Sequence, residues 1–128
     1  MAGSRSHRTL NASVAFACAA VFGVLTVAVS PCARADVVAY LVNVHVRPGY
    51  NFPNADAALS YGYGICDKFA AGRGFPDVMG DVRADFNTSD DFQASYLISQ
   101  AVNELCPAQI WQLRNTAAHY QSPPGVTP

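Results

Sequence analysis

The sequence predicts an all-α fold, a small compact bundle of four to five short helices closed by one disulfide. Apolar residues recur at helical spacing in successive segments, which is typical of amphipathic helices packed around one core. One segment, residues 42–47, alternates apolar and polar residues like a strand, but no second strand candidate exists to pair with it. Two cysteines, Cys66 and Cys106, fall on apolar helix faces and are expected to form the disulfide.

An export signal is predicted at the N-terminus. Arg5 and Arg8 precede an apolar run, residues 10–29, that has no charged residue, and Ala33-Arg34-Ala35 matches a signal-peptidase site. A membrane anchor is the alternative, since about 20 apolar residues can span a bilayer, but the cleavage site favours removal of the run. Residues 1–35 are therefore a signal peptide. The product is expected to be secreted, in the extracellular space or cell envelope, with no stable membrane insertion after cleavage.

Cleavage changes the charge and the cysteine content of the chain. Without Arg5, Arg8 and Arg34, five Lys and Arg remain against nine Asp and Glu, a net charge of −4. Such a chain lacks the basic patch that binds nucleic acids or anionic lipids, so neither is an expected partner. In an oxidising compartment the two remaining cysteines are expected to pair. They lack a C-x-x-C spacing, which favours a structural disulfide over a redox site.

The first element of the mature chain, residues 37–46, is ambiguous between helix and strand. The alternating valines of residues 42–47 favour a strand, whereas Asp36 is a good N-cap for a helix. Four apolar residues follow at helical spacing: Val37, Tyr40, Leu41 and Val44. Because a lone strand leaves its backbone groups unpaired, we predict a short helix over about residues 37–44. The segment Arg47-Pro48-Gly49-Tyr50 then forms a turn.

The second helix is predicted over residues 55–71. Asn54 can cap its first turn, and Gly72 suits the left-handed position after its end. The apolar face comprises seven residues: Ala55, Ala58, Leu59, Gly62, Ile65, Cys66 and Phe69. Gly62 and Gly64 each lower helix stability by about 1 kcal/mol relative to Ala. We therefore expect a neighbouring helix to approach this helix closely at the glycines.

Two further helices are predicted before Pro107. Pro76 suits the first position of a helix that ends near Asp85. Its inner side consists of Val78, Met79, Val82 and Phe86. The next helix opens with Thr88-Ser89-Asp90-Asp91, which resembles a capping box with Asp in place of Glu. Its apolar stripe consists of Ala94, Ile98, Ala101, Val102, Leu105 and Cys106.

After Pro107, the apolar residues Ile110, Leu113 and Ala117 predict a fifth amphipathic helix. Whether residues 108–120 pack on the bundle is open at this point. Residues 121–128 contain three prolines and are expected to be a disordered tail. The helical domain is therefore expected to cover residues 36–120.

Several of these segments together resemble a known family. They are the A-x-A leader, the run from Pro53 to Ala58 that leads to Gly62 and Cys66, the triplet Pro76-Asp77-Val78, the acidic helix cap, and the ending Cys106-Pro107. In this arrangement the chain is similar to the small secreted mycobacterial proteins grouped as domain of unknown function 732. The resemblance covers about residues 36–107 and implies an all-helical, disulfide-closed exported domain. It brings no established activity and no catalytic residues. The valine-rich first segment and the extension after residue 107 depart from the family pattern.

No catalytic, metal or cofactor motif is present in the sequence. H-E-x-x-H, G-x-S-x-G and Walker patterns are missing, and His45 and His119 lie too far apart in sequence to suggest a metal site. Asp77, Asp81 and Asp85 are interpreted as a solvated acidic stripe, and the pair Asp90-Asp91 as helix capping. We therefore expect no enzyme, no catalytic residue and no cofactor.

Aromatic residues on polar helix faces are the remaining functional signal. Tyr61 and Tyr63 flank Gly62 and so point off different sides of their helix, while Tyr96 lies on the polar side of its own. Exposed aromatic side chains are typical of binding surfaces, although small proteins always leave some aromatic surface exposed. With Trp111, these residues form the candidate binding surface of a non-enzymatic module for an unknown protein or envelope component.

The alternative hypothesis is a carrier of a small apolar ligand, such as haem or a lipid. The ligand would lie between helices near Gly62, Tyr63 and Trp111. An internal pocket of several hundred Å³ lined by aromatic residues would favour this carrier. A filled core with exposed aromatic residues would favour the binding module.

Overall fold

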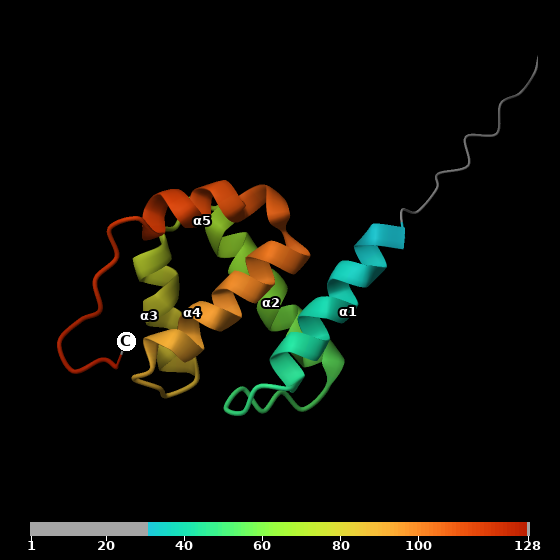
Figure 1. Ribbon diagram of the computed structural model, residues 1–128, viewed down its shortest axis with the longest axis horizontal. Coiled ribbons are helices and arrows are strands. Elements are labelled where there is room, and N and C mark those ends of the chain that lie inside the picture. The colour runs from blue at the N-terminus through green and yellow to red at the C-terminus, as the bar shows by residue number, and fades with distance from the viewer. Residues whose placement is uncertain (1–30, 128) are drawn as a thin grey trace, which may run out of the picture.

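Five α-helices surround one core in the computed structural model, which describes residues 31–127 (Figure 1). They are α1 (Pro31–His45), α2 (Ala55–Ala70), α3 (Phe75–Asp85), α4 (Asp91–Gln100) and α5 (Ile110–Ala117). A π-helical turn, Ala101–Leu105, continues α4, and a 3₁₀ turn, Pro107–Gln109, leads into α5. Within these residues the only extended pairing is one isolated bridge between Asp90 and Thr127. The predicted all-α fold is confirmed.

The arrangement places α2 and α4 at the centre of the molecule. α1 and α3 lie on opposite sides of this pair, and α5 lies across one end of the bundle (Figure 1). The π-helical turn packs against both α1 and α2. The largest fully buried side chains come from the first four helices and the π-helical turn: Tyr40, Phe69, Ile65, Met79, Leu97, Ile98, Val44, Val78, Val82 and Val102. One core therefore holds every helix that the sequence predicts before Pro107.

Residues 1–30, most of the predicted export signal, lie outside the described residues. α1 starts at Pro31, upstream of the predicted start. Asp36 therefore lies inside this helix and does not cap it, contrary to the prediction, because helical backbone continues on its N-terminal side. None of the helices in the described part of the chain is long and apolar enough to cross a membrane.

The ambiguous first segment is helical, as predicted. α1 buries Tyr40 and Val44 against the bundle, and the Tyr40 hydroxyl donates a hydrogen bond to the carbonyl oxygen of Ala58 at 3.0 Å. Burial raises the pKa of this hydroxyl above its ordinary range, so it remains a donor. Of the valines that suggested a strand, Val42 and Val44 are helical and Val46 directly follows the helix end. α2 and α4 provide an apolar surface for one side of α1.

α2 has the predicted ends. The Asn54 side chain accepts a hydrogen bond from the Ala57 N–H at 2.8 Å, and Gly72 has the left-handed φ of +85° that a residue after a helix end often adopts. Gly62 is buried where α1 and the π-helical turn come close, as expected from the missing side chain. Gly64 faces open space, so the expected close approach exists at only one of the two glycines.

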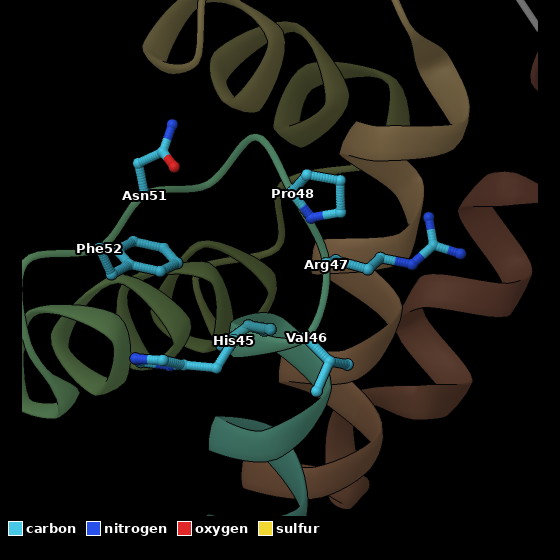
Figure 2. Close-up of a pocket in the computed structure, with 7 residues that line it drawn as sticks. His45, Val46, Arg47, Pro48, Asn51 and Phe52 are labelled. Atoms are coloured by element: carbon cyan, nitrogen blue, oxygen red, sulfur yellow. The ribbon is translucent and has the colours of Figure 1, made fainter.

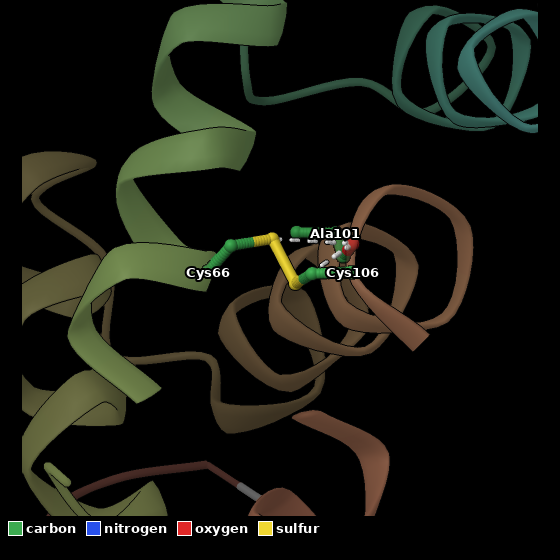
Figure 3. Close-up of a disulfide and its surroundings, with 3 residues drawn as sticks. All are labelled: Cys66, Ala101 and Cys106. Carbon is green, nitrogen blue, oxygen red and sulfur yellow. Dashed lines mark hydrogen bonds between the residues drawn. A yellow bond between two sulfur atoms is a disulfide. The ribbon is translucent and has the colours of Figure 1, made fainter. Parts of the chain in front are cut away.

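The predicted disulfide joins Cys66 of α2 to Cys106, directly after the π-helical turn (Figure 3). The Cα atoms are 6.0 Å apart. Both sulfur atoms lie 3.8 Å from the carbonyl oxygen of Ala101. The bridge therefore fixes the C-terminal end of the π-helical turn against the buried face of α2.

The starts of α3 and α4 each differ from the prediction by a few residues. Gly74 occupies the N-cap of α3, and Phe75 is its first helical residue and is buried. Asp90 caps α4 by accepting hydrogen bonds from two backbone N–H groups. Thr88, the predicted cap, instead accepts a hydrogen bond from the Asp90 N–H. The cap of α4 is thus two residues later than the capping-box pattern indicated.

The C-terminal segments pack on the bundle. The Phe75 N–H donates to Thr116 Oγ1 of α5 at 2.9 Å, and the apolar side of α5 contacts the core. The tail, residues 121–127, was expected to be disordered, but it folds back along α3 to the start of α4 (Figure 1). Its Thr127 pairs with the backbone there. Hydrogen bonds to distant residues, which no local composition reveals, hold this segment.

Candidate functional site

The four predicted binding residues lie in different environments. Trp111 and Tyr63 are exposed, at 72 % and 45 %, whereas Tyr61 and Tyr96 are half-buried. Tyr61 packs on Phe86, with ring centroids 5.2 Å apart, and its hydroxyl donates to Asp85 at 2.8 Å. None of the aromatic contacts among residues 31–127 joins two of the four. The structure therefore does not bring them together through such contacts.

A row of exposed valines along α1 is an apolar feature that the sequence analysis missed. Val38 and Val42 lie on the helix, and Val46 follows its last residue, His45, with the Val46 N–H donating to the carbonyl oxygen of Val42 at 3.0 Å. Val38, Val42 and Val46 are 57 %, 53 % and 73 % exposed, and their spacing of four residues places them on one side of the helix. Tyr40 and Val44 are buried on the other side. We call the three residues the valine face. Their regular spacing was present in the sequence, but the helix prediction rested only on the inner apolar side of this helix.

A surface pocket of about 440 Å³ adjoins one end of the valine face. Its lining comes from the end of α1 and the following loop: Val44, His45, Val46, Arg47, Pro48, Asn51 and Phe52. Figure 2 shows the imidazole of His45 beside the ring of Phe52, while the side chain of Arg47 extends away from them toward another helix. Val46 belongs to both the pocket and the valine face, so the two form one continuous surface.

Arg47 is held by aromatic rings. Its guanidinium carbon lies 3.8 Å from the ring centroid of Tyr96 and 4.7 Å from that of Phe92, a cation–π arrangement. The three ion pairs found among residues 31–127 involve other cations. Tyr96 is thus a support for the loop beside the pocket, which sequence spacing alone does not reveal.

The loop that forms the pocket is attached to α4 through Tyr50. Gly49 has a φ of +106° and lies in the predicted turn, a backbone conformation that glycine adopts without steric cost. Tyr50 is buried, and its hydroxyl donates to the carbonyl oxygen of Gln93 at 2.6 Å. Burial is the main cause that raises the pKa of Tyr50 to about 12. The hydroxyl therefore remains protonated at neutral pH and ties the loop to α4.

The acidic stripe on α3 differs from the prediction of solvated, inert side chains. Asp81 accepts hydrogen bonds from Lys68 at 2.6 Å and from Arg73 at 2.5 Å, and these bonds, Arg73 first, lower the pKa of Asp81 to about 2. Asp85 accepts the hydrogen bond from the tyrosine of α2. Asp77 is exposed, as predicted. Asp85 is exposed as well, so the prediction of solvated side chains is confirmed at these two positions. It was wrong for Asp81, because the donors to Asp81 come from α2 and the loop after it.

Asp91 is the one buried charged residue in the part of the chain that the structure describes. Burial alone would raise its pKa, but hydrogen bonds from Ser122, Tyr120 and Arg83 together lower it. The sequence analysis assigned Asp91 to helix capping. No local signal identifies this role, because two of the three donors lie in the C-terminal segment.

Two kinds of site considered from the sequence, a metal site and a ligand space beside Gly62, can be checked in the described residues. No group of three or more His, Cys, Asp or Glu side chains among them is placed to hold a metal ion. The space beside Gly62, where a carried ligand was expected, is filled by the side chains of Tyr40 and Leu105. A second surface hollow, of about 460 Å³, runs along α2 beside Gly64. Neither Tyr63 nor Trp111 lines it.

One comparison with known proteins gives a match. The family described as "Protein of unknown function (DUF732)" matches residues 35–108, more than half of the chain. No curated protein and no solved structure matches this chain. The matched region ends just after Cys106, so α5 and the tail lie beyond it.

Proposed function

We propose that this chain, which belongs to the DUF732 family, is a non-enzymatic interaction module of the extracellular space or cell envelope. It binds an apolar helix of a partner protein through the valine face. The observation that carries this proposal is the exposure of Val38 and Val42 on α1, and of Val46 directly after its end, on a helix whose opposite side is already buried. A helix that is apolar on both sides is normally buried on both sides. The rest of this chain buries only the side of α1 that carries Tyr40 and Val44.

The shape of the valine face suits a partner helix. Three residues spaced by four positions form one ridge, about 12 Å long at the helical rise of about 1.5 Å per residue. Such ridges pack into the grooves of a second helix in the commonest class of helix contact. Valine loses little rotamer freedom on burial because its χ1 angle is already restricted. The ridge is therefore rigid before a partner binds.

The charge pattern favours a protein over a membrane as the occupant. Residues 37–46 contain no Asp, Glu, Lys or Arg. Helices that lie on membranes usually carry Lys and Arg beside the apolar side to attract anionic lipids. The nearest cation in sequence, Arg47, is stacked on Tyr96 and Phe92, and the mature chain is acidic overall. An uncharged partner helix can bind the valine face without Lys or Arg beside it.

The pocket beside Val46 supplies an anchoring point. Its volume of about 440 Å³ exceeds that of any single side chain. Phe52 and Pro48 provide apolar walls, while His45, Arg47 and Asn51 add polar groups to the lining. Protein interfaces commonly gain most of their binding energy from a few aromatic or aliphatic side chains that fill such pockets. The partner helix would insert one large apolar side chain here while its own ridge packs along the valine face.

Export is supported by the signal-peptide pattern and by the disulfide. Disulfides persist in oxidising compartments and are rare in the cytosol, and Cys66 and Cys106 are joined. Both observations are consistent with a protein that acts outside the cytoplasm. The cell that exports the protein is therefore the place to seek the partner.

Site-specific photo-cross-linking in the exporting cells tests this function. A photoreactive amino acid is placed at position 42, and in separate variants at positions 63 and 111, which carry exposed aromatic residues on other helices. We expect a discrete heterologous adduct at position 42 only, with the cross-link mapped by mass spectrometry to an apolar helix. Adding Val38→Asp should abolish the adduct while the melting temperature stays unchanged.

Four results would overturn the proposal. Adducts at positions 63 and 111 alone would favour the aromatic surface predicted from the sequence. An adduct of twice the mass of the chain would identify a second copy as the occupant. Cross-links to lipid would assign the face to a membrane. An exported, folded protein without any adduct would remove the basis for a binding face on α1.

A further inference from the structure

On the side of the bundle away from α1, the C-terminal segment, residues 120–127, runs beside α3 and reaches the start of α4 (Figure 1). Asp91 lies here and is 5 % exposed. One carboxylate oxygen accepts a hydrogen bond from Arg83 at 2.6 Å. The other accepts from the Tyr120 hydroxyl at 2.8 Å and from Ser122 Oγ at 2.5 Å. Two of its three side-chain donors therefore belong to the C-terminal segment.

The same segment makes two further specific contacts. The ring of Tyr120 lies edge-on to Phe75, with centroids 5.2 Å apart and ring planes at 87°. At the far end, the Thr127 N–H donates to the carbonyl oxygen of Ser89 at 2.8 Å, and its own carbonyl oxygen accepts from the Asp91 N–H at 2.9 Å. This backbone pairing is the pattern by which extended peptides add to a protein edge. Residues 120–127 therefore contact the bundle at three places: the ring of Phe75, the carboxylate of Asp91 and the backbone of residues 89–91.

An open surface hollow adjoins the segment. Its volume is about 230 Å³, and residues of the helices and of the segment line it together. Phe75, Met79, Phe92 and Ser95 line the helix side of the hollow, and Tyr120 and Ser122 line the other side. The segment therefore borders an apolar hollow without filling it, unlike the close-packed contacts of the core.

The family match covers α3 and α4, which the C-terminal segment contacts, but not the segment itself. The residues that receive the segment lie between Phe75 and Ser95, inside the matched region, whereas residues 120–127 lie outside it. We propose that this side of α3 and α4 is a groove that binds extended peptides with a tyrosine and a serine two residues apart. Residues 120–127 occupy it as a displaceable intramolecular ligand.

The chemistry of the groove sets the ligand class. A buried carboxylate needs hydrogen-bond donors, since an unsatisfied buried charge is costly, so any ligand that displaces the segment must donate to Asp91. A tyrosine hydroxyl also places its ring against Phe75, as Tyr120 does. A ligand with these groups reproduces the side-chain contacts that Tyr120 and Ser122 make with Asp91 and Phe75.

The segment is suited to being displaced. Residues 121–125 are exposed, and only Tyr120 and Val126 are half-buried. The tether nevertheless gives the segment the advantage of a high effective concentration, of millimolar order for a short linker. A free peptide of the same sequence should therefore bind weakly to the intact chain and more tightly once the tethered segment is weakened.

The test uses the full mature chain and a fluorescent synthetic peptide of residues 119–127. In the released variant, Tyr120→Ala and Ser122→Ala remove the two side-chain donors of the segment. We expect fluorescence anisotropy to give at least tenfold tighter peptide binding by the released variant than by the wild type. A control peptide with Ala at the tyrosine and serine positions should bind neither protein.

A matched pair of serine variants locates the binding. Ser95→Leu, placed in the released variant, fills the hollow and should weaken peptide binding at least tenfold. Ser60→Leu, at an exposed serine of α2, should leave binding unchanged. Equal binding of both peptides, equal binding by wild-type and released proteins, or equal effects of the two leucines would overturn the proposal.

Hydrogen exchange on the wild-type chain keeps the proposal testable if the released variant fails to fold. The Thr127 and Asp91 amides should exchange at least a hundredfold faster than the amide of Ile98 in the core of α4, because the segment opens without global unfolding. Equal protection of all three amides would show that the segment is a permanent part of the fold and would refute its displacement.

Discussion

The hydroxyl of Tyr40 lies where a side chain at position 62 would begin. A Cβ atom added to Gly62 would be 2.7 Å from this oxygen and 2.6 Å from Leu105 Cδ1. Tyr40 cannot easily move aside, because it is fully buried and its hydroxyl donates to the carbonyl oxygen of Ala58. α1, α2 and the π-helical turn therefore meet at a position that only glycine fits.

Replacing each α2 glycine by alanine should give opposite results. Gly62→Ala creates an overpacked contact that costs about 1–3 kcal/mol, more than the gain in helix propensity of about 1 kcal/mol. Gly64→Ala adds a methyl group in open space and should stabilise the protein by about 0.5–1 kcal/mol. Urea denaturation of the two variants measures both changes. Equal effects would contradict the close approach at Gly62.

Removing the disulfide should lower the free energy of unfolding substantially. The double variant Cys66→Ala and Cys106→Ala opens a loop with a sequence separation of 40 residues, and such losses in small secreted domains cost about 2–5 kcal/mol. Thermal melting compares it with the oxidised wild type. Unchanged stability would mean that helix packing alone fixes the π-helical turn on α2.

Asp91→Asn should be strongly destabilising at neutral pH, by about 3–5 kcal/mol, because it leaves the Arg83 guanidinium without its buried counter-charge. The control is Asp67→Asn, at an exposed position of α2, which should stay within about 0.5 kcal/mol of the wild type. Chemical denaturation at pH 7 gives both values. A loss in the Asp91 variant no larger than that in the control would contradict the role assigned to this carboxylate.

The pH dependence of the same variant follows from the lowered pKa of Asp91. A carboxylate with a lowered folded-state pKa stabilises the fold fully above its unfolded pKa, about 3.9. That contribution is lost as the pH falls through the folded-state pKa. The stabilities of the wild type and Asp91→Asn should therefore converge only below about pH 4. A difference that remained constant down to pH 2 would rule out the carboxylate charge as its source.

Asp81 should contribute less, although the pKa of Asp81 is lowered to about 2. Its side chain and those of Lys68 and Arg73 are each about one-third exposed, so solvent screens the pairs. We expect Asp81→Asn to cost up to about 1 kcal/mol at pH 7, less in high salt. Asp77→Asn, on the same stripe, should have almost no effect. A loss at Asp77 as large as that at Asp81 would contradict this assignment.

The mature protein should begin at Asp36. Cleavage after Ala35 removes the first turn of α1 and leaves Asp36 in the new first turn, where a negative charge is favourable. Intact mass of the exported protein checks the cleavage site. A product that retains residues 10–29 would contradict the signal-peptide interpretation.

Local signals predicted the helices, and the reasons are visible at single residues. Asn54 and Gly72 act at the two ends of α2, as their sequence positions indicated. Cys66 and Cys106 form the predicted disulfide because the π-helical turn that ends at Leu105 packs against α2, which carries Cys66. Thr88 was the predicted cap of α4, whereas Asp90 is the observed one. The sequence does not distinguish them, because either side chain has an oxygen that can accept from the first N–H groups of the helix. Periodicity and capping chemistry were sufficient for the architecture.

The sites could not be predicted in the same way. Asp91 acquires its role from donors that are distant in sequence, Tyr120 and Ser122. Tyr61 looked exposed on its helix, but it packs on a ring from beyond α3. The valine face is the exception. Its spacing was present in the sequence, but only the structure shows which side of α1 the bundle covers.

The disulfide also decides how tension would pass through the molecule. A pull on the two chain ends runs along α1 and α2 to Cys66, crosses the sulfur–sulfur bond, and leaves through Cys106 and α5. α3 and α4 lie within the bridged loop and carry no load. Reduction would release the 40-residue separation, about 130–140 Å of extended chain at about 3.3–3.6 Å per residue. An oxidised molecule stretched between two anchors thus has a shorter maximum reach than a reduced one.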